Sequence, residues 1–320
     1  MKTLLSLLLS LLSALFSGLS LAQAYPSKPV RLIIPFPPGG SNDVVGRAIG
    51  QQLAERLGQG VVIDNRGGAG SVIGTNEAAK APPDGYALLL ISTAFPTSIA
   101  FNRLPQDALK SFAPVAMLGS GPALLVVPAN SPANSVADLL NALKAKPGEL
   151  NAAAAGIGSF QHMATELFRL QSKTSFVIVQ YKGGGPALTD TIGGQVQFNL
   201  GSLVQMVPHV RSGKLKALGV SSAKRVAAMP EVPTIAEAGV AGYEVSNWWG
   251  LLAPAGTPAP VLDRLYKEII AILDSPETRK RFELEGAEVM RMSPAEFANF
   301  VSQETVKWTK VVKEAGIKPE

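Results

Sequence analysis

Short apolar runs, rich in β-branched residues, alternate with amphipathic segments along most of this chain. The run Val30–Phe36 predicts a buried strand, and Ser41–Leu57 predicts a helix that stops at Gly58. Further strand and helix pairs follow, through to the strand expected at Leu215–Val220. Repeated βα alternation is typical of a parallel sheet flanked by helices, so the sequence predicts an α/β fold.

Two extended apolar segments, Gly121–Pro128 and Trp248–Pro254, join the repeated units without a Ser/Gly-rich linker. Two short strands are expected at the first crossover, near Ala113–Leu118 and Ala123–Pro128. The pair Trp248-Trp249 in the second crossover fits a core position and a cleft wall equally well. Two extended crossovers between α/β lobes are the geometry of a cleft that closes about a hinge.

The helices that close the chain have no sheet of their own, which favours a discontinuous first lobe. We expect that lobe to comprise residues 25–123 and 252–320. Residues 124–251, with the two hinge crossovers, would form the inserted second lobe. At 320 residues the chain is long enough for both lobes to bury a core.

The first 24 residues predict a secretory signal peptide. Lys2 precedes the apolar run Leu4–Leu21, and Ala22-Gln23-Ala24 has the small-x-small pattern of a cleavage site. We expect cleavage after Ala24 and a periplasmic location, with an uncleaved membrane anchor as the alternative. No later segment is apolar enough to span a membrane, so we expect a soluble, monomeric mature protein.

Composition and motifs exclude several chemistries. The chain has no cysteine and two histidines, which leaves little room for thiolate or zinc sites. Its net charge of +5 suits small anions, but the basic residues are too scattered to bind nucleic acid. The dinucleotide, P-loop, hydrolase-elbow and zinc-protease motifs are absent, and no acid–base pair is visible. We expect no cofactor, no metal and no enzymatic activity.

Glycine-rich turns that open onto helices are the strongest indication of a ligand site. Four of them follow predicted strands: Pro35–Asn42, Gly67–Ser71, Gly156–Ser159 and Lys182–Gly185. The first N–H groups of a helix are unpaired and carry partial positive charge, so they attract anions. Such turns lie at the carboxyl ends of strands, where open α/β sheets bind ligands.

The mature sequence resembles the Bug-type solute-binding proteins, the periplasmic receptors of tripartite tricarboxylate transporters, over essentially its whole length. The resemblance is specific because the matching segments are numerous and collinear. They are Tyr25–Val30 (YPSKPV), Ile34–Gly40 (IPFPPGG), Asn65–Gly70 (NRGGAG), Pro83–Tyr86 (PDGY), Gly158-Ser159 with His162, Tyr181–Gly184 (YKGG), Ser212–Leu215 (SGKL), Pro230–Thr234 (PEVPT), Glu237–Gly239 (EAG) and Ala253–Pro258 (APAGTP).

The resemblance implies a two-lobed periplasmic-binding-protein fold, or Venus flytrap, with a largely parallel sheet in each lobe. It implies a receptor that binds a small organic carboxylate between the lobes and delivers it to membrane transporter subunits. The ligand-binding positions carried over are Phe36, Pro37, Gly39, Gly40, Ser41, Asn42, Asp43, Ser92, Thr93, Ala94, Gly158, Ser159, His162, Tyr181, Lys182, Gly183, Gly201 and Ser202.

Three of these positions have more than one interpretation. His162 fits a ligand-facing residue and a partly buried helix residue equally well. Asp43 is interpreted as a partner for a helix dipole before it is interpreted as a general base. Many family members have an aspartate where Gly201 stands, so this chain is expected to bind a carboxylate without an amine. A periplasmic sensor for a signalling partner, or an enzyme on the same fold, are the alternative functions.

Overall fold

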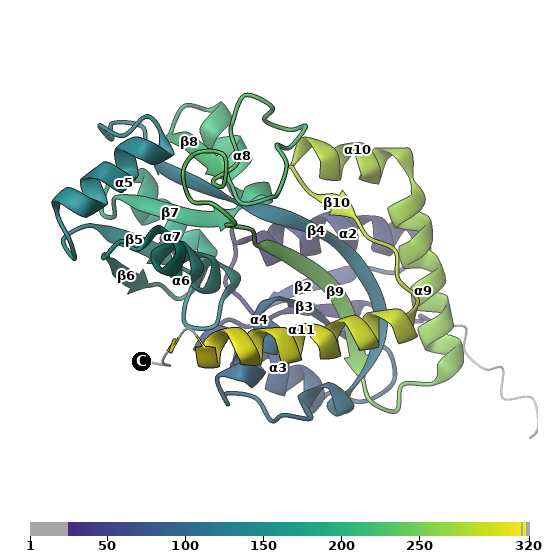
Figure 1. Cartoon of the computed structure of the whole chain (residues 1–320). Helices are drawn as coiled ribbons and strands as arrows, with labels where there is room; N and C mark the ends of the chain where they lie inside the picture. The colour runs from purple at the N-terminus through teal and green to yellow at the C-terminus, as the bar shows by residue number, and fades with distance from the viewer. Residues whose placement is uncertain (1–24, 315, 318–320) are drawn as a thin grey trace, which may run out of the picture.

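The computed structural model describes residues 25–314 and 316–317 of the chain. The predicted signal peptide, with its cleavage site after Ala24, lies outside the described residues. Two lobes stand side by side, and each is a curled sheet with helices packed on it (Figure 1). The two-lobed α/β fold expected from the sequence is confirmed. In the described part of the chain, no helix is long and apolar enough to cross a membrane.

The first lobe is built on a sheet with the strand order β2-β1-β3-β9-β4, and β10 pairs with β4. The pairs β1–β2 and β1–β3 are parallel, whereas every pair that involves β4 or β9 is antiparallel, so this sheet is mixed and has fewer parallel pairs than the largely parallel sheet that was expected. These strands are β1 (Val30–Ile34), β2 (Val61–Asn65), β3 (Ala87–Ser92), β4 (Phe112–Pro128), β9 (Ser246–Pro254) and β10 (Glu288–Val289).

Helices cover both faces of this sheet, which explains its continuous apolar strands. Leu32 and Leu88 pack with Ile49 of α2 on one face, whereas Leu89 packs with Phe297 of α11 on the other. The helical segments are α2 (Ser41–Leu57), η1 (Ala69–Ser71), α3 (Val72–Ala79), α4 (Ala94–Ala100), η2 (Ala108–Ser111), α9 (Ala259–Asp274), α10 (Pro276–Leu284) and α11 (Pro294–Glu314).

The second lobe contains the parallel strands β7-β5-β6, and β4 pairs antiparallel with both β7 and β8. Leu125 and Val127 of β4 pack with the cluster around Phe168, whereas Leu124 and Val126 pack against α8. The elements are α5 (Val136–Ala145), β5 (Asn151–Ala154), α6 (Phe160–Ser172), β6 (Val177–Gln180), α7 (Gly184–Ile192), β7 (Phe198–Ser202), α8 (Leu203–Arg211) and β8 (Leu215–Val220).

Strand β4 runs through both lobes without interruption, so the prediction of two short strands at this crossover was wrong. Up to Pro122 it pairs with β9, and from Ala123 it pairs with β7. Gly119 and Gly121 remain extended, and the β4–β9 register shifts twice, between Pro114 and Ala116 and between Met117 and Gly119. Such irregularities bend a strand, which lets one strand serve two differently oriented sheets.

Strand β9 pairs with β3 and β4 of the first sheet, from Ser246 to Pro254. The lobe boundaries expected at residues 123/124 and 251/252 remain a proposal; the pairing of β4 supports the first, and that of β9 favours moving the second to about residue 246. Trp248 and Trp249 are both core residues, and the Trp248 indole N–H donates to Glu304 over 3.1 Å. The residue that this crossover contributes to the cleft is Asn247, which precedes the two tryptophans.

The ring of Phe297 packs against Gly250 of β9 and leaves no room for a side chain at that position. A Cβ built at Gly250 would overlap that ring. We expect Gly250→Ala to lower the free energy of unfolding by about 1–3 kcal/mol, the usual cost of overpacking a core. Urea denaturation followed by circular dichroism measures the loss.

The matched control is Gly193→Ala at the end of α7. Its φ is −72° and the nearest atom to the new Cβ is the Thr189 carbonyl oxygen at 3.5 Å, so no strain is added. A Gly250→Ala variant as stable as Gly193→Ala would contradict the close packing of Phe297 against Gly250.

Candidate ligand site between the lobes

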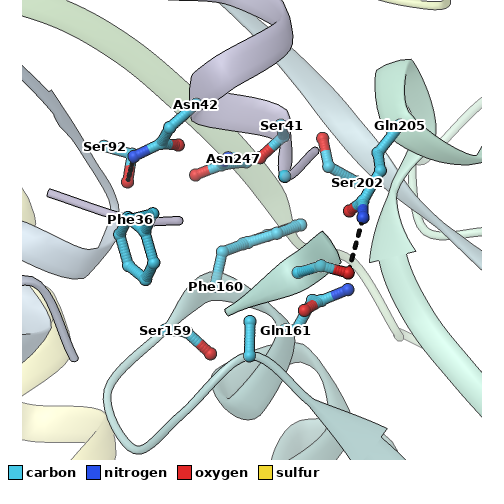
Figure 2. A pocket seen from close by; sticks show the side chains of 13 residues that line it. Phe36, Ser41, Asn42, Ser92, Ser159, Phe160, Gln161, Ser202, Gln205 and Asn247 are labelled. Carbon is cyan, nitrogen blue, oxygen red and sulfur yellow. Dashed lines mark hydrogen bonds between the residues drawn. The ribbon is translucent and has the colours of Figure 1, made fainter. Parts of the chain in front are cut away.

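A narrow cavity lies between the two lobes, and its lining comes from both of them (Figure 2). The centre of a water molecule can occupy about 30 Å³ of it. The lining residues are Phe36, Gly40, Ser41, Asn42, Ser92 and Asn247 from the first lobe, and Ala155, Ser159, Phe160, Gln161, Gly184, Ser202 and Gln205 from the second.

Four helices begin at the wall of this cavity. The first residues of α2 (Ser41), α6 (Phe160) and α7 (Gly184) line it, and so does Ser202, the N-cap of α8. Each helix start carries about half a positive charge and has unpaired N–H groups. Their convergence makes the cavity electropositive although no lining residue is charged. An anion is the ligand that such an arrangement favours.

The loop before α2 is braced by the buried carboxylate of Asp43. The carboxylate accepts hydrogen bonds of 3.0 Å from the backbone N–H of Gly39, the Arg47 guanidinium and the Asn65 amide. Burial by itself would raise the pKa of Asp43, but the hydrogen bonds, with that from Arg47 the largest, outweigh it and hold the pKa below its usual value. Asp43 therefore positions the Pro-Gly loop rather than facing the cavity.

The amide side chains from the first lobe are oriented by hydrogen bonds. Asn42 donates its Nδ2 to Ser92 Oγ over 3.2 Å (Figure 2). Asn247 accepts the backbone N–H of Thr93 at its Oδ1 over 3.4 Å, which leaves its Nδ2 as a donor for the cavity. Both residues are buried, so their remaining polar atoms are available only to a ligand or water in the cleft.

In the second lobe, Gln205 and Ser159 fix the starts of α7 and α6. Gln205 donates its Nε2 to the Gly184 carbonyl over 2.7 Å (Figure 2). Ser159 caps α6, because its Oγ accepts the backbone N–H of His162 over 3.1 Å. Both contacts hold the helix ends that face the cavity.

His162 lies next to the cavity wall but belongs to the core. It is 4% exposed, and its Nδ1 accepts the N–H of Gly158 over 3.2 Å. Desolvation, with smaller effects from Arg169 and Arg103, lowers its pKa from 6.5 to about 4. His162 is therefore a neutral residue that shapes the Gly158 turn.

Several other predicted site residues are not among those that line the cavity. The Tyr181 hydroxyl donates to Asp190 over 2.9 Å. Desolvation, followed by this hydrogen bond and the Asp190 charge, raises the pKa of Tyr181 to about 12. Lys182 is exposed, and Ala94 is buried at the start of α4. A Cβ at Gly201 would lie 2.9 Å from Gln161 Nε2 and would overlap Met206 Cε. A side chain at position 201 would therefore displace the amide of Gln161, which lines the cavity.

The remaining predicted glycines let the lobes approach each other. A Cβ at Gly183 would come within 2.6 Å of Pro37 Cδ across the cleft. Thr97 of the first lobe donates its hydroxyl to the Gly158 carbonyl of the second. The loop Gly67–Ser71 also serves this contact, because a Cβ at Gly70 would overlap the Ile157 carbonyl oxygen. These close approaches describe a closed cleft.

Of the residues predicted for the site, the structure gathers seven at the cavity: Phe36, Gly40, Ser41, Asn42, Ser92, Ser159 and Ser202. The six that sequence reasoning missed are Ala155, Phe160, Gln161, Gly184, Gln205 and Asn247. Phe160, Gln161 and Gly184 directly follow predicted positions at helix starts, so a wider window there would have found them. Asn247 and Gln205 have no local signal.

Comparison with known proteins shows that the chain is similar to periplasmic receptors with two lobes. A family model described as "Tripartite tricarboxylate transporter family receptor" matches residues 45–317. The chain therefore belongs to this receptor family. It is 38% identical over 300 residues to the protein BugT of Bordetella pertussis, and the match covers 93% of this chain and 92% of BugT.

Solved structures share the fold closely. The periplasmic binding protein BugD is 34% identical with a TM-score of 0.88, covering 92% of this chain and 100% of BugD. An R. palustris protein solved with adipate is 36% identical, with a TM-score of 0.88 and the same coverage. MatC of Rhodopseudomonas palustris, solved with bound malate, is 33% identical with a TM-score of 0.84, covering 90% of this chain and 100% of MatC.

The depressed pKa of His162 makes folding stability depend on pH. Between its ordinary value of 6.5 and about 4, the unfolded chain binds a proton that the folded chain does not. Stability from this group is therefore complete above pH 6.5 and is lost as the pH falls through that window. We expect a loss of about 2 kcal/mol between pH 7 and pH 4.5, measured by urea unfolding.

The His162→Gln variant should lose less stability between the same two pH values, because the titrating group is gone. His209→Gln is the control, since His209 is only partly buried. If His162→Gln and the unsubstituted protein have the same pH dependence, the protonation behaviour assigned to His162 is wrong.

Proposed function

We propose that this protein is a periplasmic solute receptor that binds a small organic carboxylate between its lobes. It then delivers the ligand to the membrane subunits of a tripartite tricarboxylate-type transporter. The proposal includes cleavage after Ala24, a monomeric mature protein, and ligand binding without catalysis.

The observation that carries the proposal is the convergence of four helix starts on a cavity whose lining has no charged side chain. An ammonium group there would meet partial positive charges, and no carboxylate lines the cavity to offset them. A carboxylate instead accepts hydrogen bonds from N–H groups and hydroxyls that are already in place. The electrostatics of the site thus favour an acid without an amine.

The relatives support the same ligand class. Adipate and malate are the carboxylates in the two R. palustris structures, and both proteins are more than 30% identical to this chain over nine-tenths of its length or more. The transporter as partner is inferred from family membership, because the family is described as a transporter receptor.

Charge should decide which ligands bind. We expect succinate to bind, succinamide to bind at least tenfold more weakly, and aspartate to bind at least tenfold more weakly than succinate. A buried, unpaired polar group costs about 1–3 kcal/mol, and any cost above about 1.4 kcal/mol corresponds to more than tenfold in affinity. Glutarate, glutaramide and glutamate form a second matched set. Isothermal titration calorimetry measures all six compounds, after a thermal-shift screen over mono-, di-, tri- and aromatic carboxylates has shown which chain length binds.

Equal binding of the acids and their neutral amides would contradict an anion site. Tighter binding of the amino acids would contradict the electrostatics assigned to the helix starts. Ser202→Asp provides an internal check, because it places a carboxylate at the N-cap of α8 and should abolish binding of the acids. Ser212→Asp, at the other end of the same helix, is the control.

Closure of the lobes should accompany binding. Residues of both lobes line the cavity, so a dicarboxylate enters when the lobes separate and is enclosed when they close around it. Small-angle X-ray scattering should show a smaller radius of gyration with saturating carboxylate than without it. The same experiment with succinamide should show no change. An unchanged radius of gyration with a carboxylate that calorimetry shows to be bound would contradict hinge closure.

A further inference from the structure

The amide of Gln161 is oriented by a chain of buried hydrogen bonds. Thr191 donates its hydroxyl to the Ala187 carbonyl over 2.7 Å, because a carbonyl can only accept. Its Oγ1 therefore accepts from Asn199 Nδ2 over 3.0 Å. The Oδ1 of Asn199 is then the atom that faces Gln161, and it accepts from Gln161 Nε2 over 3.3 Å. This series fixes which end of the Gln161 amide is the donor.

The other end of that amide, Oε1, is left as an acceptor at the cavity wall. Gln161 is 4% exposed, and its Oε1 has no hydrogen-bond partner among the residues that the structure describes. Gln161 is one of the residues that line the cavity, where Figure 2 labels it, so an opening of the cleft would bring this atom next to a bound ligand. A buried acceptor is satisfied only by a donor, which a carboxylate at neutral pH does not have.

We propose that Gln161 Oε1 accepts a hydrogen bond from a hydroxyl group of the ligand, so that the site prefers hydroxycarboxylates to the corresponding unsubstituted acids. This inference rests on the proposed function, because it names the kind of carboxylate that the same cavity takes. A hydroxyl fits better than an ammonium, since it supplies a donor without adding positive charge beside four helix starts.

A second buried group supports a polar, oxygen-rich ligand. Ser202 is 2% exposed and lines the cavity, and its Oγ also has no partner in the described part of the chain. A serine hydroxyl can donate to a carboxylate oxygen or to the oxygen of a ligand hydroxyl. The wall therefore offers one acceptor with a fixed orientation and one hydroxyl that adapts to either partner.

The glycine at position 201 is needed for this orientation of Gln161. Because a Cβ there would lie 2.9 Å from Gln161 Nε2, any larger residue displaces the amide that donates to Asn199. The absence of a side chain at Gly201 thus permits the orientation of Gln161. In this chain, Gln161 Oε1 is the atom that recognises a hydroxyl substituent on the ligand.

Calorimetry on matched acids tests the inference. The probes are malate with succinate and 2-hydroxyglutarate with glutarate, with each hydroxy acid supplied as separate enantiomers. We expect one enantiomer of the hydroxy acid to bind about tenfold more tightly than the unsubstituted acid of the same length. Because the acceptor lies at one place in the wall, the two enantiomers should differ.

Variants separate the orientation of Gln161 from its mere presence. Gln161→Met removes the acceptor at similar size and should reduce the ratio of the two affinities to about one. Thr191→Val leaves every cavity residue in place but removes the acceptor for Asn199 Nδ2. Asn199 can then turn its Nδ2 toward Gln161, which uses Oε1, so the hydroxyl preference should fall in the same way. Thr189→Val is the matched control, because Thr189 lies on the same helix and its hydroxyl donates only to Gly185.

The possible outcomes are distinct. Equal affinity of hydroxy and unsubstituted acids for the unsubstituted protein overturns the inference but leaves the carboxylate receptor standing. A hydroxyl preference that survives Thr191→Val overturns the orienting chain. If none of these acids binds and none of the other carboxylates in the screen does, the proposed function fails and the inference with it. Loss of preference in Thr191→Val together with retention in Thr189→Val supports it, even where Gln161→Met does not fold.

Discussion

The backbone hydrogen bonds of β4 hold the two lobes in one structure. This strand of 17 residues pairs with β9 and β10 in one sheet and with β7 and β8 in the other. In parallel βα units the helix starts lie at the carboxyl edge of the sheet. Because β4 joins the two sheets, the helix starts of both lobes meet at one cavity. The ligand site is thus a consequence of how one strand is shared.

The cavity presents oriented backbone groups instead of charged side chains. A buried arginine or lysine would have to be desolvated and would need its own partners, whereas helix N–H groups are already fixed by the helices that carry them. The buried carboxylate of Asp43 lies behind the Pro-Gly loop and accepts a hydrogen bond from its backbone at Gly39. The charge of Asp43 thus holds a loop in place, whereas the helix dipoles face the cavity.

Features that depend on local sequence were predictable, and features that depend on distant contacts were not. An apolar run followed by a glycine or serine turn is a local pattern, so Ser41 and Ser159 were found. Asn247 and Gln205 are ordinary amides whose role comes from tertiary placement. The continuity of β4 was missed because Gly119–Pro122 contains residues that usually end strands. Helix α10 buries only Thr278 and Phe282 and has no apolar periodicity, so its sequence pattern does not predict a helix.

The uncharged lining has a consequence for proton exchange. None of the residues at the cavity wall has a side chain that titrates near neutral pH. Closing the lobes around a ligand therefore transfers no proton between this wall and the solvent. The variation of affinity with pH then follows the ionisation of the ligand itself, and the apparent midpoint reports the ligand's carboxyl groups. Calorimetric heats should accordingly be independent of the buffer's own enthalpy of ionisation when the ligand is fully ionised.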